Sequence, residues 1–223
     1  MTFRDRDDAG RQLAERLSEQ AYESPVVLAL PRGGVPVAAH VAAALNAPLE
    51  VYVARKIGAP GHPEYGIGAI AEGGNEIVVT GAVDQLGLGP EQMRRLADDE
   101  RAELARRVSA YRGSTPLPPL EGRDVILVDD GLATGVTAEA AVRTLLAHHP
   151  RRVVLAVPVC PPDTRDRLSG IADEVVAITV PPDLGGIGAW YQDFSQTSDD
   201  EVVGVLERFR AGTGPRAAPG ETP

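Results

Sequence analysis

Cysteine, lysine and aromatic residues are scarce in this chain of 223 residues. The single cysteine, Cys160, excludes an intrachain disulfide, and no spacing of cysteine and histidine indicates a zinc site. No apolar run approaches the ~18 residues that a membrane-spanning helix needs, and the first residues are too charged for a signal peptide. We therefore expect a cytoplasmic protein that does not bind a membrane.

Basic residues are outnumbered by acidic ones, 22 to 32, and the formal net charge is −10 at pH 7. This charge argues against nucleic acid as a partner, because the phosphates would be repelled. The 22 basic residues are 21 arginines and one lysine, Lys56. A general bias toward arginine explains most of this count, but a retained lysine can mark a position where a compact point charge matters.

Predicted helices and strands alternate along the chain. Short apolar segments predict strands at 25–31, 49–54, 67–71, 77–80, 125–128, 153–157 and 174–180. Apolar residues at helical spacing predict helices at 3–21, 35–46, 90–111, 136–148 and 199–210, with a short one near 163–168. Glycine and proline predict a loop at 58–66. The alternation predicts an α/β fold with a mainly parallel, twisted sheet flanked by helices.

The segment VILVDDGLATGVT, residues 125–137, is the most informative stretch. An aliphatic strand runs into Asp129 and Asp130, and a small loop then leads into a helix. Ligands of parallel sheets bind beyond the carboxyl ends of the strands. Backbone N–H groups before a helix suit a phosphate, and Thr134 and Thr137 add hydroxyl donors, whereas the two carboxylates suit hydroxyl groups. The segment therefore predicts a sugar phosphate site.

Other known patterns account less well for this segment. A Walker A loop would need a lysine where Val136 stands, and a phosphorelay receiver domain would need a lysine after residue 56. The string GIGAIA at residues 66–71 matches a dinucleotide fingerprint in letters only, because no helix is predicted after it. An ordinary strand-to-helix turn, in which Asp129 caps nearby amides, is the structural alternative.

This segment resembles the phosphoribosyl diphosphate (PRPP) signature of type I phosphoribosyltransferases, and the likeness extends over about residues 25–194. In that family a base nitrogen attacks C1′ of PRPP, diphosphate leaves, and Mg²⁺ is the cofactor. The resemblance implies that Asp129 and Asp130 bind the ribose hydroxyls or Mg²⁺. It implies that the loop Ala133, Thr134, Gly135, Val136 and Thr137 holds the 5-phosphate. We call residues 129–137 the PRPP loop.

Two further segments fit the same family. LPRGGVPVA, residues 30–38, resembles the diphosphate loop, in which Arg32 would clamp diphosphate oxygens and Gly33 and Gly34 would offer N–H groups. The family often has a cis peptide here, which corresponds to the bond between Pro31 and Arg32. Residues 54–70 resemble the flexible catalytic loop, with Arg55 and Lys56 facing the anion and Glu64 and Tyr65 near the base. A surface turn and a solvated surface loop are the respective alternatives.

The resemblance also predicts a small hood over the base, at about residues 181–198. Trp190, Tyr191 and Phe194 cluster there in a chain with only 4% aromatic residues. Trp190 and Tyr191 could stack on a heterocycle or anchor the segment to the core. Asp193 follows at a position where some purine enzymes bind a second Mg²⁺. We expect one domain over residues 1–211, a helical insertion at about 84–113, a disordered tail at 212–223, and a homodimer.

Two departures from the hypoxanthine-guanine enzymes bear on the acceptor. Ala133 stands where they have an aspartate base, and the hood has no lysine or arginine between Leu168 and Arg208. A 6-oxopurine acceptor is therefore not favoured. Three classes of function stay open at this point: a phosphoribosyltransferase acting on a nitrogenous base, a non-catalytic regulator that binds PRPP or a nucleotide, and a ribose-phosphate hydrolase.

Overall fold

The computed structural model describes residues 2–212, with the side chain of Glu64 outside the described part. Its centre is a parallel sheet in the order β2-β1-β6-β7-β8. The strands are β1 (Val26–Ala29), β2 (Leu49–Val51), β6 (Asp124–Val128), β7 (Arg152–Val159) and β8 (Glu174–Thr179). Strands β1 and β6 are buried throughout, as continuous aliphatic runs in a sheet covered on both faces should be. The predicted α/β class with a parallel sheet is confirmed.

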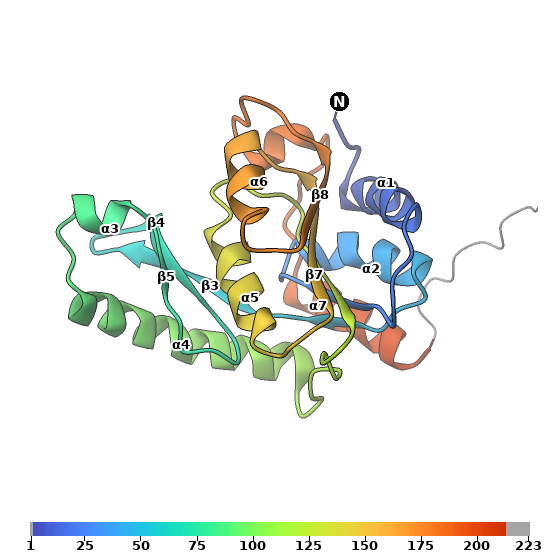
Figure 1. Cartoon of the computed structure of the whole chain (residues 1–223), viewed down its shortest axis with the longest axis horizontal. Helices are drawn as coiled ribbons and strands as arrows, with labels where there is room; N and C mark the ends of the chain where they lie inside the picture. The colour runs from blue at the N-terminus through green and yellow to red at the C-terminus, as the bar shows by residue number, and fades with distance from the viewer. Residues whose placement is uncertain (1, 213–223) are drawn as a thin grey trace, which may run out of the picture.

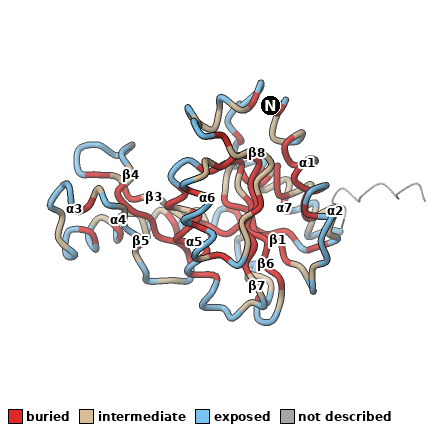
Figure 2. Tube along the Cα trace, turned by 45° about the horizontal axis from the view of Figure 1, so that its top comes forward, coloured by how far each residue is buried: buried red, intermediate tan, exposed pale blue. Residues whose placement is uncertain are grey.

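Helices cover both faces of this sheet (Figure 1). On one face lie α1 (Arg6–Ser18), α2 (Gly34–Ala44) and α7 (Asp199–Arg210), and on the other α5 (Val136–Leu146) and α6 (Pro162–Leu168). Alternate residues of a strand enter the two cores: Ile126 packs with the α1 side and Leu127 with the α5 side. Buried residues follow these strands through the middle of the molecule (Figure 2).

A second, antiparallel sheet projects from the body as an arm (Figure 1). It consists of β3 (Ala54–Ala59), β4 (His62–Ala71) and β5 (Val78–Val79), and the arm is completed by α3 (Ala82–Gln85) and α4 (Pro90–Arg112). Helix α4 packs on β3 and β4. Its buried side chains share one face and are those of Met93, Ala97, Leu104 and Tyr111.

The arm corrects two predictions. Residues 58–66 were predicted as a loop but belong largely to the hairpin of β3 and β4, and the single strand predicted at 49–54 is divided between β2 and β3. Glycine and proline argue against strands in sequence, but here the pairing shifts register around Gly58. A Cβ atom on Gly58 would lie 2.4 Å from the carbonyl oxygen of Pro63, so the close approach of the two strands requires glycine.

Smaller differences concern the ends of elements. Helix α3 and the short 3₁₀ helix Ile187–Trp190 were not predicted, and α1 begins at Arg6 instead of residue 3. None of the helices within residues 2–212 is long and apolar enough to cross a membrane. The predicted tail lies, from residue 213 onward, outside the described residues.

Candidate functional site

The acidic pair of the PRPP loop lies at the carboxyl end of β6, the middle strand of the parallel sheet. Asp130 keeps only 9% of its surface exposed. The Oδ1 atom of Asp129 accepts a 2.8 Å hydrogen bond from the backbone N–H of Asp130. Strand β1 pairs with β6 in parallel, so the loops that follow these two strands meet at one edge of the sheet.

Both carboxyl groups of the pair have raised pKa values. Burial is the main cause at Asp129, and the neighbouring Asp130 carboxylate adds to it. Burial also raises the pKa of Asp130, against the opposing effect of the Arg6 guanidinium. Two carboxylates thus share one guanidinium, and the arrangement suits a site that a cation or several hydroxyl donors complete.

The rest of the PRPP loop is held from one side by α6. Thr164 donates its hydroxyl to the carbonyl oxygen of Ala133 at 2.7 Å, and Arg167 donates to that of Thr134. Gly135 adopts a left-handed conformation with φ of 66°, and a Cβ atom there would lie 2.8 Å from the Thr164 methyl group. The first N–H groups of α5, which begins at Val136, have no acceptor within the helix. This leaves donors for an anion at the loop.

The loop after β1 packs directly against the acidic pair. The Pro31–Arg32 peptide bond is cis, as the resemblance predicted. A Cβ atom on Gly33 would lie 1.9 Å from Asp130 Oδ2, and one on Gly34 would lie 2.7 Å from the carbonyl oxygen of Val128. Only glycine permits this approach, so the structure brings together the two segments that the sequence singles out.

Arg32 turns from this loop toward α7. Its Nη1 atom lies 3.7 Å from Asp199 Oδ1, which also accepts a 2.6 Å hydrogen bond from the hydroxyl of Tyr111 on α4. The Arg32 side chain is 30% exposed. Arg32, which is predicted to bind the diphosphate, therefore has an acidic neighbour, Asp199, at the start of α7. The sequence did not indicate this contact.

Arg55 and Lys56, the two basic residues predicted to face the anion, lie on opposite faces of β3. Arg55 forms an ion pair with Glu100 of α4, with Nη2 at 2.7 Å from Oε2. Lys56 is the next residue of β3, so its side chain leaves the opposite face of the strand, and its Cδ atom would lie 2.8 Å from a Cβ atom on Gly66. His62 and Tyr65 are exposed near the turn, and the side chain of Glu64 lies outside the described residues.

The two predicted base-binding residues have structural partners in the hood. Tyr191 is 6% exposed, packs against Phe3 and Phe194 with ring centroids 5.4 and 5.0 Å away, and donates its hydroxyl to the carbonyl oxygen of Asp130 at 2.6 Å. Trp190 is partly buried and donates its indole N–H to the carbonyl oxygen of Leu184. These contacts favour the anchoring interpretation for Tyr191.

Arg6 is a site residue that sequence reasoning missed. It is the first residue of α1, and its Nε atom donates to Asp130 Oδ2 at 2.8 Å. The two residues are 124 positions apart in sequence. Arginines are abundant in this chain, and nothing in the local pattern around Arg6 distinguishes it from the exposed Arg11 of the same helix.

Within residues 2–212, no cluster of three or more His, Cys, Asp or Glu side chains is arranged to hold a metal. Asp193 lies in the hood, where its Oδ1 atom accepts hydrogen bonds from the N–H and hydroxyl groups of Ser195, and these bonds lower the pKa of the Asp193 carboxyl. Asp129 and Asp130 are the two carboxylates of the PRPP loop itself.

The chain matches the family model described as "Phosphoribosyl transferase domain" over residues 6–192. It is 47% identical over 206 residues to the Mycobacterium tuberculosis proteins named "Putative phosphoribosyl transferase MT0597" and "Putative phosphoribosyl transferase Rv0571c". The match covers 92% of this chain and 46% of each relative, so the chain spans about half the length of these proteins.

A solved structure is similar over almost its whole length. The protein TT1426 from Thermus thermophilus shares 45% sequence identity and superimposes with a TM-score of 0.79, covering 94% of this chain and 99% of the other. The family match covers the five-stranded sheet, the diphosphate loop, the arm and the PRPP loop. The protein is a member of the phosphoribosyl transferase domain family.

Proposed function

We propose that this chain transfers the 5-phosphoribosyl group of PRPP to a nitrogenous base or related acceptor and releases diphosphate. The observation that carries the proposal is the meeting of two loops at one sheet edge. Gly33 and Gly34 pack on Asp129 and Asp130, next to the amides that begin α5. A sugar that carries a phosphate at one end and a diphosphate at the other matches this arrangement, in which carboxylates that accept hydrogen bonds lie between two groups of backbone amides that donate them.

Each part of the site has a role in this reaction. The amides and hydroxyls of residues 133–137 bind the 5-phosphate, and Asp129 and Asp130 accept hydrogen bonds from the ribose hydroxyls. Arg32 and the glycine amides bind the diphosphate. When the acceptor nitrogen forms its bond to C1′, the bond from C1′ to the diphosphate oxygen breaks and its electron pair leaves with the diphosphate. Lys56 of the arm stabilises this departing charge.

The acidic pair fits Mg²⁺. This ion prefers hard oxygen ligands and is usually bound through one or two carboxylates together with substrate phosphates. Asp129 and Asp130 supply such oxygens, and the raised pKa of Asp129 is that of a carboxyl without full compensating charge. The bound ion would neutralise diphosphate oxygens. A second ion at Asp193 is a further part of the proposal.

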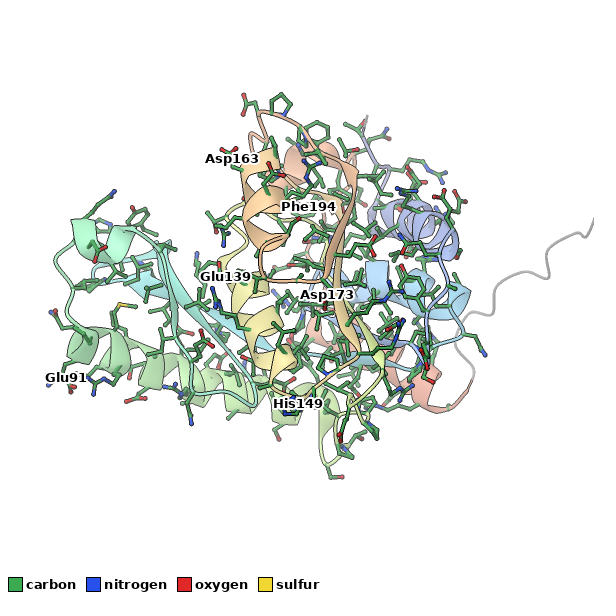
Figure 3. All side chains as sticks on the ribbon, viewed as in Figure 1. Glu91, Glu139, His149, Asp163, Asp173 and Phe194 are labelled. Atoms are coloured by element: carbon green, nitrogen blue, oxygen red, sulfur yellow. The ribbon has the colours of Figure 1, made fainter. Side chains whose placement is uncertain are left out.

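The acceptor is proposed to bind between the PRPP loop and the hood. At 37% exposure, Phe194 is the most exposed ring of the hood, whereas Trp190 is partly buried and Tyr191 is buried. In Figure 3, Phe194 is labelled in the upper part of the body, whereas Glu91 is labelled on the arm. Although the hood segment itself has no basic residue, Arg6 brings a guanidinium to it from α1. Its N–H groups already bind Asp130 and Ser195, which is consistent with a poor fit for 6-oxopurines.

The proposal is tested by diphosphate release from PRPP with a panel of nucleobases and aromatic amides. Release that requires both Mg²⁺ and one class of acceptor is the expected result. The double variant Asp129→Asn with Asp130→Asn should abolish release and weaken PRPP binding, as measured by calorimetry. Release without any acceptor would identify a hydrolase, and PRPP binding without turnover on any acceptor would identify a regulator. Equal PRPP affinity in the double variant would contradict the site itself.

A further inference from the structure

Arg6 joins the ribose side of the candidate site to the hood. Its Nε atom donates to Asp130 Oδ2 at 2.8 Å, and its Nη1 atom donates to the carbonyl oxygen of Ser195 at 2.6 Å. The guanidinium carbon lies 4.0 Å from the centre of the Phe194 ring. One planar group therefore contacts the PRPP loop, the hood backbone and the hood aromatic ring at once.

The backbone of Arg6 is fixed from both sides. Before it, Phe3 pairs with the hood: its N–H donates to the carbonyl oxygen of Trp190 at 2.7 Å, and its own carbonyl accepts from Gln192 at 2.8 Å. Arg6 itself begins α1, and the preceding residue, Asp5, caps the helix by accepting from the N–H of Asp8 at 2.7 Å. The guanidinium is held in place before any substrate binds, which reduces the ordering cost of its contacts.

Stability alone is a poor explanation for this ion pair. The side chains of Arg6 and Asp130 are each 12% exposed, so both charges lose most of their hydration. Buried ion pairs contribute little net stability on average, because desolvation offsets the attraction. The pair also uses the carboxylate that the fold presents at the carboxyl end of β6, where a ligand is expected. A functional role for the contact is therefore the stronger interpretation.

Arg6 contacts one oxygen of the Asp130 carboxylate. Arg6 engages the Oδ2 atom, which is also the atom that Gly33 approaches most closely. The guanidinium is itself fixed by its second hydrogen bond to Ser195, so it holds this oxygen of Asp130 in one position. A lysine at position 6 could bind either Asp130 Oδ2 or the carbonyl oxygen of Ser195 as a point charge. It could not bridge both oxygens in a fixed plane, and it could not stack on Phe194 as a guanidinium does.

We propose that Arg6 is a positioning residue that orients Asp130 for the ribose hydroxyls and couples the occupancy of that site to the order of the hood. The identity of the ligand rests on the proposed function, but the coupling between Asp130 and the hood does not. Arg6 takes no part in bond making. Its effect is that PRPP binding tightens the hood, so the acceptor meets a formed site.

Trp190 is the single tryptophan of the chain, so its fluorescence reports on the hood. The first test uses the protein without substrate. Acrylamide should quench Trp190 more strongly in Arg6→Ala than in the parent protein, and Asp130→Asn should have a similar effect. The double variant should show little more quenching than either single variant, because both single changes break the same contact between Arg6 and Asp130. Arg11→Ala, an exposed arginine of the same helix paired with Asp8, is the matched control and should leave quenching unchanged.

The second test adds PRPP with Mg²⁺. PRPP should alter Trp190 emission in the parent protein and in Arg11→Ala. Arg6→Ala should bind PRPP roughly tenfold more weakly or worse, as expected for the loss of a charge-assisted contact. Arg6→Lys should recover part of this affinity but not the change in Trp190 emission. Thermal unfolding of each variant identifies any that fails to fold. If Arg6→Ala does not fold, the comparison is made with Arg6→Lys.

The results separate the two proposals. Quenching of Arg6→Ala and Arg6→Lys equal to the parent would overturn the coupling, whatever the ligand. Full recovery of the PRPP-induced emission change by lysine would also overturn it, because charge alone would then suffice. Failure of the parent protein to bind PRPP in calorimetry would instead contradict the proposed function, while the substrate-free quenching would still decide whether Arg6 couples Asp130 to the hood.

Discussion

The hydroxyl of Tyr191 donates a 2.6 Å hydrogen bond to the backbone carbonyl oxygen of Asp130, 61 residues earlier in the chain. Burial is the main cause of the strongly raised pKa of Tyr191, so the hydroxyl stays protonated and remains a donor across the physiological pH range. The bond joins the hood to the PRPP loop through the backbone, beside the side-chain contact of Arg6. The hood is thus attached to the ribose site at two points.

Truncation of Tyr191 should damage the fold as well as the site. Tyr191→Phe removes one buried hydrogen bond and should lower the unfolding free energy by ~0.5–1.5 kcal/mol. Tyr191→Ala also removes the ring between Phe3 and Phe194 and should cost ~3–5 kcal/mol. Thermal unfolding and ligand titration measure both effects. Weaker acceptor binding with unchanged stability would instead show that Tyr191 stacks on the base.

Asp129→Asn should stabilise the protein near neutral pH while weakening PRPP binding. A carboxyl whose pKa is raised on folding contributes stability below its unfolded pKa, near 3.8, and that contribution is lost as pH rises through the higher folded pKa. At pH 7 the charge that Asp129 carries in the unfolded chain is therefore a cost to folding, and asparagine removes the charge but keeps the oxygen. We expect a gain of ~0.5–2 kcal/mol.

Thermal unfolding in a chelating buffer from pH 7 to pH 4 measures this effect. The gain should shrink as the pH falls, because the parent carboxyl becomes protonated. Asp99→Asn, at an exposed position of α4, is the control and should show no comparable gain. A loss of stability in Asp129→Asn at pH 7 would contradict the raised pKa of this group.

Gly33→Ala should disrupt the acidic pair through a single methyl group. Gly33 has φ of −61° and ψ of −30°, which alanine adopts readily, so any damage comes from the clash with Asp130 Oδ2. We expect a loss of ~1–3 kcal/mol in stability, typical of overpacking, and a marked fall in PRPP affinity. Gly81→Ala is the matched control, because its φ is −59° and nothing lies within 4 Å of the new Cβ atom. Equal PRPP affinity in both variants would remove the diphosphate loop from the proposed site.

Lys56 and Arg55 should differ in their effect on turnover. If Lys56 stabilises the departing diphosphate, Lys56→Ala should lower kcat on the order of a hundredfold, with a smaller effect on PRPP affinity. Arg55→Ala breaks the ion pair with Glu100 and should mainly loosen the arm. Steady-state kinetics and PRPP calorimetry on both variants check this. An unchanged kcat in Lys56→Ala would leave it as a surface residue, and a large loss of PRPP affinity in Arg55→Ala would restore Arg55 to the PRPP site.

Local sequence was sufficient to predict the parallel sheet and to single out the segment of residues 129–137. The strand of residues 124–128, the acidic pair and the glycine before α5 are contiguous, so their chemistry and spacing are visible without a structure. The same holds for the diphosphate loop, where Pro31–Arg32 has the expected cis bond and both glycines pack on the acidic pair. Aliphatic runs separated by helices identified the α/β class, because strands buried on both faces need continuous apolar segments.

Tertiary structure decided what depends on distant partners. The glycine- and proline-rich segment 58–66 forms a hairpin because its strands pair with each other and pack on α4. The stabilisation from this pairing and packing is not part of the local strand propensity of the segment. Tyr191 is an anchor because Phe3 and Asp130 meet it from distant parts of the chain. Arg6 joins the site because the first turn of α1 lies against the carboxyl end of β6. Arginine has the same sequence signature on a surface and in a site, and only the position of its partner across the fold distinguishes the two.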